Sequence, residues 1–238
     1  MKTMLYGIRV QLKMDIRSKT LLVTCYVVPL LFFAIMGGIF TSLMPEAKHT
    51  LIQSMTVMGV SMGALIGVPP SMIEVYSTDI KKMYIANGIP LCFGVIALVV
   101  SAFIHLMIMS IIIFALAPIV FHATIPSNIP LYFITLALFV IVSLTISCVL
   151  GLAVKNQAKL TMYSQVVFLP SIMLSGIMFS AELLPNFLES MGKLFPATWG
   201  YTLLIQKNIE VSTFIPLVFI LIISAFVSVQ LLKKIRSE

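Results

Sequence analysis

The chain has 238 residues, of which 60% are hydrophobic and only 10% are charged, and its formal net charge is +7. Soluble domains carry about 25% charged residues, so a soluble fold of this size could not hide so much apolar surface. The composition therefore excludes a soluble globular protein and indicates an all-α polytopic membrane protein. The positive charge is better explained by its distribution along the chain than by nucleic-acid binding.

The first 19 residues form a basic amphipathic segment. Four apolar residues recur at helical spacing between Leu5 and Ile16, and three basic residues between Arg9 and Arg17 form the neighbouring stripe. This pattern predicts an interfacial elbow helix over residues 1–19, which lies along the inner leaflet with its basic side chains extended towards lipid phosphates. The alternative is a basic flank without regular structure.

Six uncharged apolar segments are candidates for membrane-spanning helices. The first would be about 36 Å long as a helix, which is enough for a hydrocarbon core of about 30 Å. We therefore predict a single transmembrane domain over residues 1–238 with six transmembrane helices. The predicted spans are residues 20–43, 51–73, 91–121, 131–154, 160–178 and 214–232.

The second predicted span contains a glycine stripe. Gly59, Gly63 and Gly67 recur every four residues, so one face of this helix has no side chains and can approach another helix closely. The pattern favours a role in helix packing. It does not distinguish packing within one subunit from packing across a dimer.

A short capped helix is predicted between the second and third spans. Thr78 is a good N-cap, and Asn87-Gly88 is a typical stop signal, so the helix should cover Asp79–Ala86. An exposed apolar face on such a rigid helix could bind in the groove of a partner, whereas an ordinary interfacial loop would pack that face against lipid. The apolar face consists of Ile80, Met83 and Tyr84.

The distribution of Lys and Arg predicts the orientation. If both termini are cytoplasmic, the inner segments hold twelve basic residues: five before residue 20, two in 74–90, two in 155–159 and three after residue 232. The outer segments hold only Lys48, Lys193 and Lys207. This bias follows the positive-inside rule, so we expect the helix Asp79–Ala86 to lie in the cytoplasm and residues 179–211 to lie outside.

Residues 179–211 are predicted to form a re-entrant, extracellular segment. The apolar run of the fifth span breaks at Ser175-Gly176 and continues as a segment too polar to span the membrane. Pro185 stands near the start of its helical pattern, and Pro196 stops it. Such an amphipathic helix lies at the membrane boundary. Its predicted apolar face consists of Leu184, Phe187, Leu188, Met191 and Phe195.

Several kinds of chemistry are missing from the sequence. It contains no GxxxxGK[ST] motif for ATP, no HExxH motif and no cluster of metal-ligating residues. The predicted spans carry no charged residue, which argues against a self-contained ion-coupled carrier. A serine-type intramembrane enzyme with Ser175 as nucleophile stays an alternative, although none of the three histidines follows Ser175.

Three features together resemble the ABC type-2 permease family, the membrane subunits of certain ATP-binding-cassette transporters. The first is a basic amphipathic N-terminal helix that leads into six spans. The second is the stretch from Asp79 to Leu91, which is similar to the short charged helix of that family and its Pro-containing entry to the third span. The third is the pattern Ser175-Gly-Ile-Met-Phe179, Glu182-Leu-Leu-Pro185, Phe195-Pro196 and Tyr201 before the last span.

The resemblance implies an export permease that works as a dimer, either with a second copy or with a paired paralogue, together with separate ATPase subunits. ATP and Mg²⁺ would bind to those ATPase subunits, and this chain would hold no cofactor, no metal and no catalytic residue. The substrate would be a drug, an antimicrobial compound, an amphipathic peptide or toxin, or a lipid, exported across a bacterial cell membrane. The residues implied in coupling to the ATPase are Asp79, Ile80, Lys82, Met83 and Tyr84.

The resemblance also assigns the segment before the last span to an outer re-entrant cap. That cap would line or gate the exit of the exporter. A stand-alone immunity membrane protein, which protects without transport, is a further alternative. The implied cap residues are Ser175, Gly176, Phe179, Pro185, Phe187, Leu188 and Met191.

Overall fold

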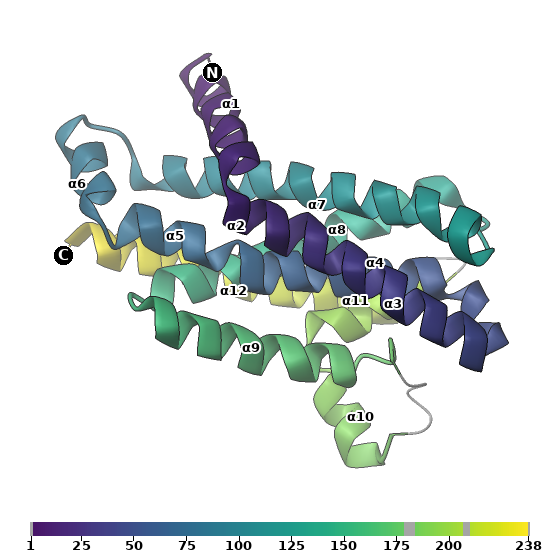
Figure 1. The fold of residues 1–238 in the computed structure, drawn as a ribbon. Helices are drawn as coiled ribbons and strands as arrows, with labels where there is room; N and C mark the ends of the chain where they lie inside the picture. Colours follow the sequence, from purple (N-terminus) through teal and green to yellow (C-terminus); the bar gives the residue numbers. More distant parts are fainter. Residues whose placement is uncertain (1, 179–183, 207–209, 238) are drawn as a thin grey trace.

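The computed structural model describes residues 2–178, 184–206 and 210–237, and all regular structure in these ranges is helical (Figure 1). The first part consists of α1 (Lys2–Arg17), α2 (Lys19–Leu22), η1 (Val23–Val27), α3 (Val28–Leu43), η2 (Pro45–His49), α4 (Leu51–Met62), η3 (Gly63–Gly67) and α5 (Pro69–Tyr76). The second part consists of α6 (Asp79–Ala86), α7 (Leu91–Phe121), α8 (Ile129–Ala153), α9 (Gln157–Met173), α10 (Asn186–Gly192), α11 (Pro196–Ile205) and α12 (Val211–Ser237).

Five helical stretches in the described ranges are long and apolar enough to cross a membrane. The second of them continues to Tyr76, beyond the predicted end at Ile73, and the last begins at Val211 rather than at residue 214. The architecture is therefore that of an all-helical polytopic membrane protein. Helices suit a membrane because they satisfy their own backbone hydrogen bonds in lipid. The five stretches are Lys19–Leu43, Leu51–Tyr76, Leu91–Phe121, Ile129–Ala153 and Val211–Arg236.

The helix α9 lies where the fifth span is predicted over residues 160–178. It has 17 residues and ends at Met173, so it is about 26 Å long. The end of the helix has a local cause. Ser175 Oγ donates a hydrogen bond to the carbonyl of Ile172 at 2.8 Å, and Gly176 adopts a φ of 83°, a left-handed conformation that terminates helices.

The stretch Leu51–Tyr76 forms the centre of the bundle. In its most apolar window 89% of the residues are buried, against 22% for Lys19–Leu43 and 17% for Val211–Arg236. Met55 and Met58 are part of this core, so they pack inside the chain. The outer faces of α3 and α12 are left free to contact lipid or a second subunit.

The glycine stripe packs within the chain. A Cβ at Gly67 would lie 3.0 Å from Thr24 Oγ1 and 3.2 Å from Cys25 Sγ, and one at Gly63 would overlap Leu106. Gly59 similarly faces Met109. The stripe thus lets α4 and η3 approach the first span and α7 closely. Its glycines therefore serve helix packing within one subunit.

Two π-helical turns face each other at this contact. The turn η1 lies in the first span and η3 lies in the second, and residues of the two turns pack together through Cys25 and Gly67. In each π turn the backbone hydrogen bonds join residues i and i+5, and this pairing widens the helix locally.

Hydrogen bonds also join helices that are distant in sequence. Tyr132 Oη on α8 donates to Thr56 Oγ1 on α4 at 2.9 Å, and both residues are buried. Tyr26 Oη in η1 and His105 Nδ1 on α7 are hydrogen-bonded at 2.7 Å. His105 thus has a hydrogen-bond partner on a neighbouring span through its Nδ1 atom.

The elbow helix α1 is attached to α7 by a buried carboxylate. Asp15 is only 4% exposed, and Ser101 Oγ donates a hydrogen bond to its Oδ2. Gln11 Nε2, one turn earlier on α1, donates to Asp15 Oδ1 at 2.7 Å. The elbow is thus held to α7 by a specific polar contact in addition to its apolar stripe.

The ends of the bundle are clearly separated. Figure 1 shows α6 and the C-terminus at one end, and the ends of α3 and α7 at the other. The two groups of site residues considered below lie at these opposite ends.

Candidate functional site

The helix α6 has the bounds Asp79–Ala86 that its capping pattern predicts. Thr78 Oγ1 accepts a hydrogen bond from the backbone N–H of Ile80, and Gly88 adopts a φ of 65° beyond the other end. Lys82 Nζ lies 2.8 Å from Asp79 Oδ1. The hydrogen bond from Lys82 lowers the pKa of Asp79, so this carboxylate stays ionised in the first turn, where a negative charge favours the helix.

The exposed apolar surface of α6 differs from the predicted face. Met83 is 61% exposed and Ile80 is 38% exposed, as predicted for a surface that contacts a partner. Tyr84 is instead half-buried and packs onto α7, where a Cβ at Gly94 would lie 2.9 Å from its ring. Tyr84 therefore anchors the helix, and Ile85, which is 50% exposed, is an apolar surface residue that the helical pattern did not single out.

The segment that carries α6 is braced against the membrane helices. Tyr76 Oη at the end of α5 donates a hydrogen bond to the carbonyl of Leu91, the first residue of α7, at 2.6 Å. The two helices that flank α6 are thereby tied together at its base. A force on α6 would consequently reach both the second and the third span.

At the opposite end, the predicted outer cap borders a cavity of about 490 Å³. Ser175 and Gly176 line it from the turn after α9, and residues of α3, η2, α4 and α11 supply the other walls. Ser54 Oγ donates to Tyr201 Oη across it at 3.2 Å. The lining combines apolar side chains with several hydroxyl groups, those of Thr50, Ser54, Ser175, Thr198, Tyr201 and Thr202.

The amphipathic helix of the cap is shorter than the predicted pattern. α10 covers Asn186–Gly192, with exposed Pro185 at its N-cap, and Pro196 begins the separate helix α11. Side chains of α11 end α10: Thr198 Oγ1 donates to the carbonyl of Gly192 at 2.6 Å, and Trp199 Nε1 donates to that of Lys193 at 2.7 Å. The helix therefore stops before Phe195, although the apolar spacing continues.

Two of the three cap residues predicted on α10 are on its surface. Phe187 is 72% exposed and Met191 is also exposed, while Leu188 is half-buried. Leu194, just after the helix, is exposed as well. Phe179 was assigned to the same cap, but it lies outside the described residues. An exposed aromatic and aliphatic surface of this kind fits the boundary of a membrane.

The depth of α10 can be measured with single cysteines. We expect a cysteine at Phe187 to react poorly with a membrane-impermeant thiol reagent added from outside, because lipid covers this side chain. A cysteine at Glu189, whose carboxylate bonds Lys193 at 2.8 Å, should react readily. Equal labelling of the two positions would show that α10 is an ordinary aqueous loop.

Ser175 has surroundings that do not suit a nucleophile. It is buried, and its hydroxyl donates to a backbone carbonyl rather than to a base. His105 is bonded to Tyr26, and His49 Nδ1 lies 3.0 Å from Thr124 Oγ1. Ser175 therefore has a structural role in ending α9.

The sequence pattern of the ABC-2 type transporter family matches residues 6–209, which is most of the chain. The chain belongs to the ABC-2 type transporter family. No match was found among proteins of curated function. In an ABC-2 type transporter the membrane subunit works with an ABC ATPase, so the serine-enzyme alternative has no support in the family or in the surroundings of Ser175.

Membership of the ABC-2 family covers the elbow α1 from Tyr6 onward, α6 and the outer cap in a single match. Both groups of predicted site residues therefore lie within the region that matches the family. They do not form one site, since α6 and the outer cavity lie at opposite ends of this ABC-2 subunit.

Proposed function

We propose that this chain is the permease subunit of an ATP-driven exporter of hydrophobic or amphipathic substrates, working as a dimer with separate ATPase subunits. In this proposal the protein lies in a bacterial cell membrane with both termini in the cytoplasm and α9 as the fifth of its six spans. ATP and Mg²⁺ bind to the partner ATPase. The observation that carries the proposal is α6, a capped helix that presents Ile80 and Met83 at the basic end of the bundle.

The coupling role of α6 follows from its position and rigidity. Its two ends continue into α5 and α7, which Tyr76 and Leu91 hold together. Closure of an ATPase pair against α6 would therefore move the inner ends of the second and third spans. Exposed apolar side chains on a short helix are suited to a groove in a partner protein.

The outer cavity supports an amphipathic substrate. Its hydroxyl groups can bind a polar part, and Phe40, Ile177 and Met178 provide an apolar wall. The helix α11 borders this cavity, and the cap that it forms with α10 would control the exit. The exposed faces of α3 and α12 leave room for the second permease subunit, whether a copy or a paralogue.

A charged residue on α6 tests the coupling. We expect Met83→Asp to weaken co-purification of the ATPase by about tenfold or more, because an unpaired carboxylate would be buried in an apolar contact. Substrate-stimulated ATP hydrolysis should fall in parallel. Met191→Asp, the same change on an exposed methionine of α10, is the matched control and should leave the association unchanged.

Thermal unfolding of the two methionine variants checks that the permease is intact. Tyr84→Asp does not serve this purpose, since Tyr84 packs onto α7 and its loss would disturb the fold. An ATPase that still binds the folded Met83→Asp variant with unchanged affinity would exclude α6 as the coupling helix.

A further inference from the structure

A second cavity lies near α6, at the junction of the α6–α7 link with the last turns of α12. Its volume is about 490 Å³. The link residues from Gly88 to Cys92 form one wall, and Leu232 and Val229 on α12 form part of the other. The cavity therefore touches the segment through which α6 is joined to the third span.

The charged residues among its described lining are both cations. Lys233 and Arg236 lie three positions apart on α12, a spacing that puts them on one helical face, and both side chains are exposed. No described carboxylate lines the cavity. Its mouth consequently attracts an anion.

The start of α7 adds a third anion-binding element. Leu91 and Cys92 open a helix of 31 residues and line the cavity with their own atoms. The first amide groups of a helix have no intrahelical acceptor, and this end carries the positive pole of the helix dipole. A helix N-terminus and two cations that line one cavity are suited to a phosphate group.

The remaining lining is apolar. Ile85, Ile89, Val229 and Leu232 also line the cavity. A soluble anion would make no use of these side chains, whereas an acyl chain would cover them. The cavity thus combines a phosphate-binding mouth with a groove for a hydrocarbon chain.

We propose that this cavity binds an anionic phospholipid of the cytoplasmic leaflet, with its phosphate between Lys233, Arg236 and the N-terminus of α7. The proposal takes from the proposed function only the orientation of the bundle. Basic pockets between membrane helices on the cytoplasmic side suit such headgroups. The bound lipid would join α12 to the α6–α7 link and so stabilise the position of α6.

Cys92 provides a native reporter of occupancy. It lines the cavity and is exposed, whereas Cys25 and Cys148 are buried. The full chain is placed in nanodiscs of phosphatidylcholine alone or with about one third phosphatidylglycerol, and a small uncharged maleimide is added. We expect phosphatidylglycerol to slow the labelling of Cys92 by roughly tenfold, because two basic residues contribute to lipid binding.

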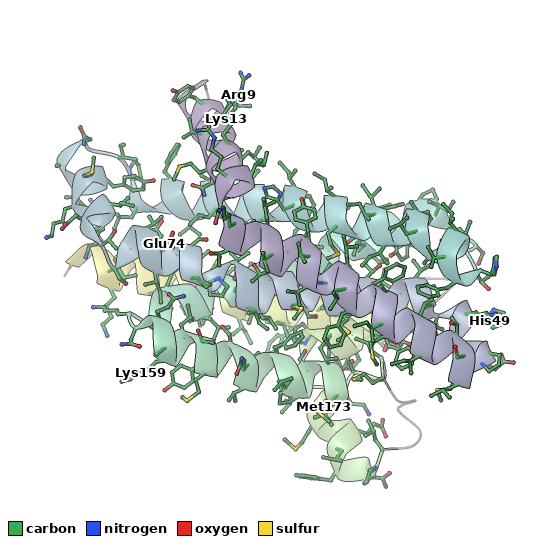
Figure 2. All side chains as sticks on the ribbon, viewed as in Figure 1. Arg9, Lys13, His49, Glu74, Lys159 and Met173 are labelled. Atoms are coloured by element: carbon green, nitrogen blue, oxygen red, sulfur yellow. The ribbon has the colours of Figure 1, made fainter. Side chains whose placement is uncertain are left out.

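Two variants separate this site from the general surface charge. Lys233→Gln combined with Arg236→Gln should abolish the effect of phosphatidylglycerol and remove one retained phosphatidylglycerol per chain in native mass spectrometry. Lys159→Gln should preserve both readouts, since Lys159 is a basic residue at the start of α9 that does not line the cavity (Figure 2). An equal response of the two variants would overturn the proposal.

Inorganic phosphate distinguishes a lipid from a soluble anion. Phosphate added to nanodiscs of pure phosphatidylcholine should leave the labelling rate of Cys92 unchanged. Protection equal to that by phosphatidylglycerol would show a soluble-anion site and would also overturn the proposal. These readouts need no ATPase, so their failure is distinct from a failure of the Met83→Asp test of export coupling.

Discussion

Gly200→Ala is expected to lower the free energy of unfolding by about 2–3 kcal/mol, through overpacking of the core. A Cβ at this position would overlap the ring of Phe139 and lie 2.7 Å from its Cε2 atom. Phe139 is completely buried on α8, so its ring has no free space into which it can move. The added methyl group must therefore push α11 away from α8.

Gly38→Ala is the matched control for this substitution. Gly38 also lies in a helix, but a Cβ there would meet only Phe121, at 3.9 Å. Because alanine favours a helix over glycine by about 1 kcal/mol, Gly38→Ala should be neutral or slightly stabilising. Unfolding of both variants in detergent provides the comparison, and equal stability would show that α11 does not pack against α8 as described.

Gly200→Ala should impair the proposed transport function as well as folding. Thr198, Tyr201 and Thr202 on α11 line the outer cavity, so a displaced α11 changes the shape of that cavity. We expect substrate-stimulated ATP hydrolysis to fall at temperatures where the variant is still folded. Binding of the ATPase should persist, because α6 lies at the other end of the bundle.

Asp15→Ala is expected to destabilise the attachment of α1 by about 3 kcal/mol, since it leaves two donors without their acceptor. Ser101 is fully buried and would lose its partner, as would Gln11. Asp15→Asn keeps one oxygen acceptor for Ser101 and puts an NH2 donor in place of the other oxygen. The Gln11 carboxamide can turn its own oxygen towards that donor, so the cost should be about 1 kcal/mol. The difference between these two variants measures the polar contact separately from the side-chain volume.

Limited trypsin digestion locates this effect in α1. Arg9 and Lys13 project from the elbow, as Figure 2 shows, and a detached α1 would be cut faster at these residues. Asp15→Ala should accelerate that cleavage well beyond Asp15→Asn, while the core helices stay resistant. Identical cleavage rates in the two variants would mean that α1 is held by its apolar stripe alone.

Local signals were sufficient to predict α6. Its N-cap and its stop signal act on neighbouring residues only, so Thr78 and Gly88 define the same bounds in the sequence and in the structure. Which side chains of α6 are exposed depends instead on α7. Tyr84 was predicted to face a partner because its packing against Gly94 is a tertiary contact that helical periodicity does not contain.

For the segment after α9, the sequence predicted the break in the apolar run but not the point at which α10 ends. The break at Ser175-Gly176 is a backbone effect that these residue types indicate. The end of α10 is decided by Thr198 and Trp199, which come from the following helix and satisfy its last carbonyl groups. The apolar spacing from Leu184 to Phe195 carries no information about that contact, although Pro196, a residue type favoured at the first position of a helix, indicates a new helix start.

Asp15 shows a different limit of sequence patterns. Among the basic residues of the elbow it looks like an ordinary surface carboxylate, yet Ser101, 86 positions later, buries it. Ser101 is one of two serines in a largely apolar helix, and the sequence around it gives no sign of this partner. A pairing of this kind depends on how the helices are placed, which the composition of either segment does not determine.

The paired π turns change which residues share a helix face in the first two spans, and mutational data on these spans must be interpreted accordingly. A π turn accommodates about one residue more than an α turn, which corresponds to a rotation of roughly 100°. Beyond η1 and η3, residues therefore occupy a different side from the one that an uninterrupted helical wheel assigns to them. Scanning mutagenesis of Lys19–Leu43 or Leu51–Tyr76 should give two separate periodic patterns, out of phase with each other, that meet at Val23–Val27 and Gly63–Gly67.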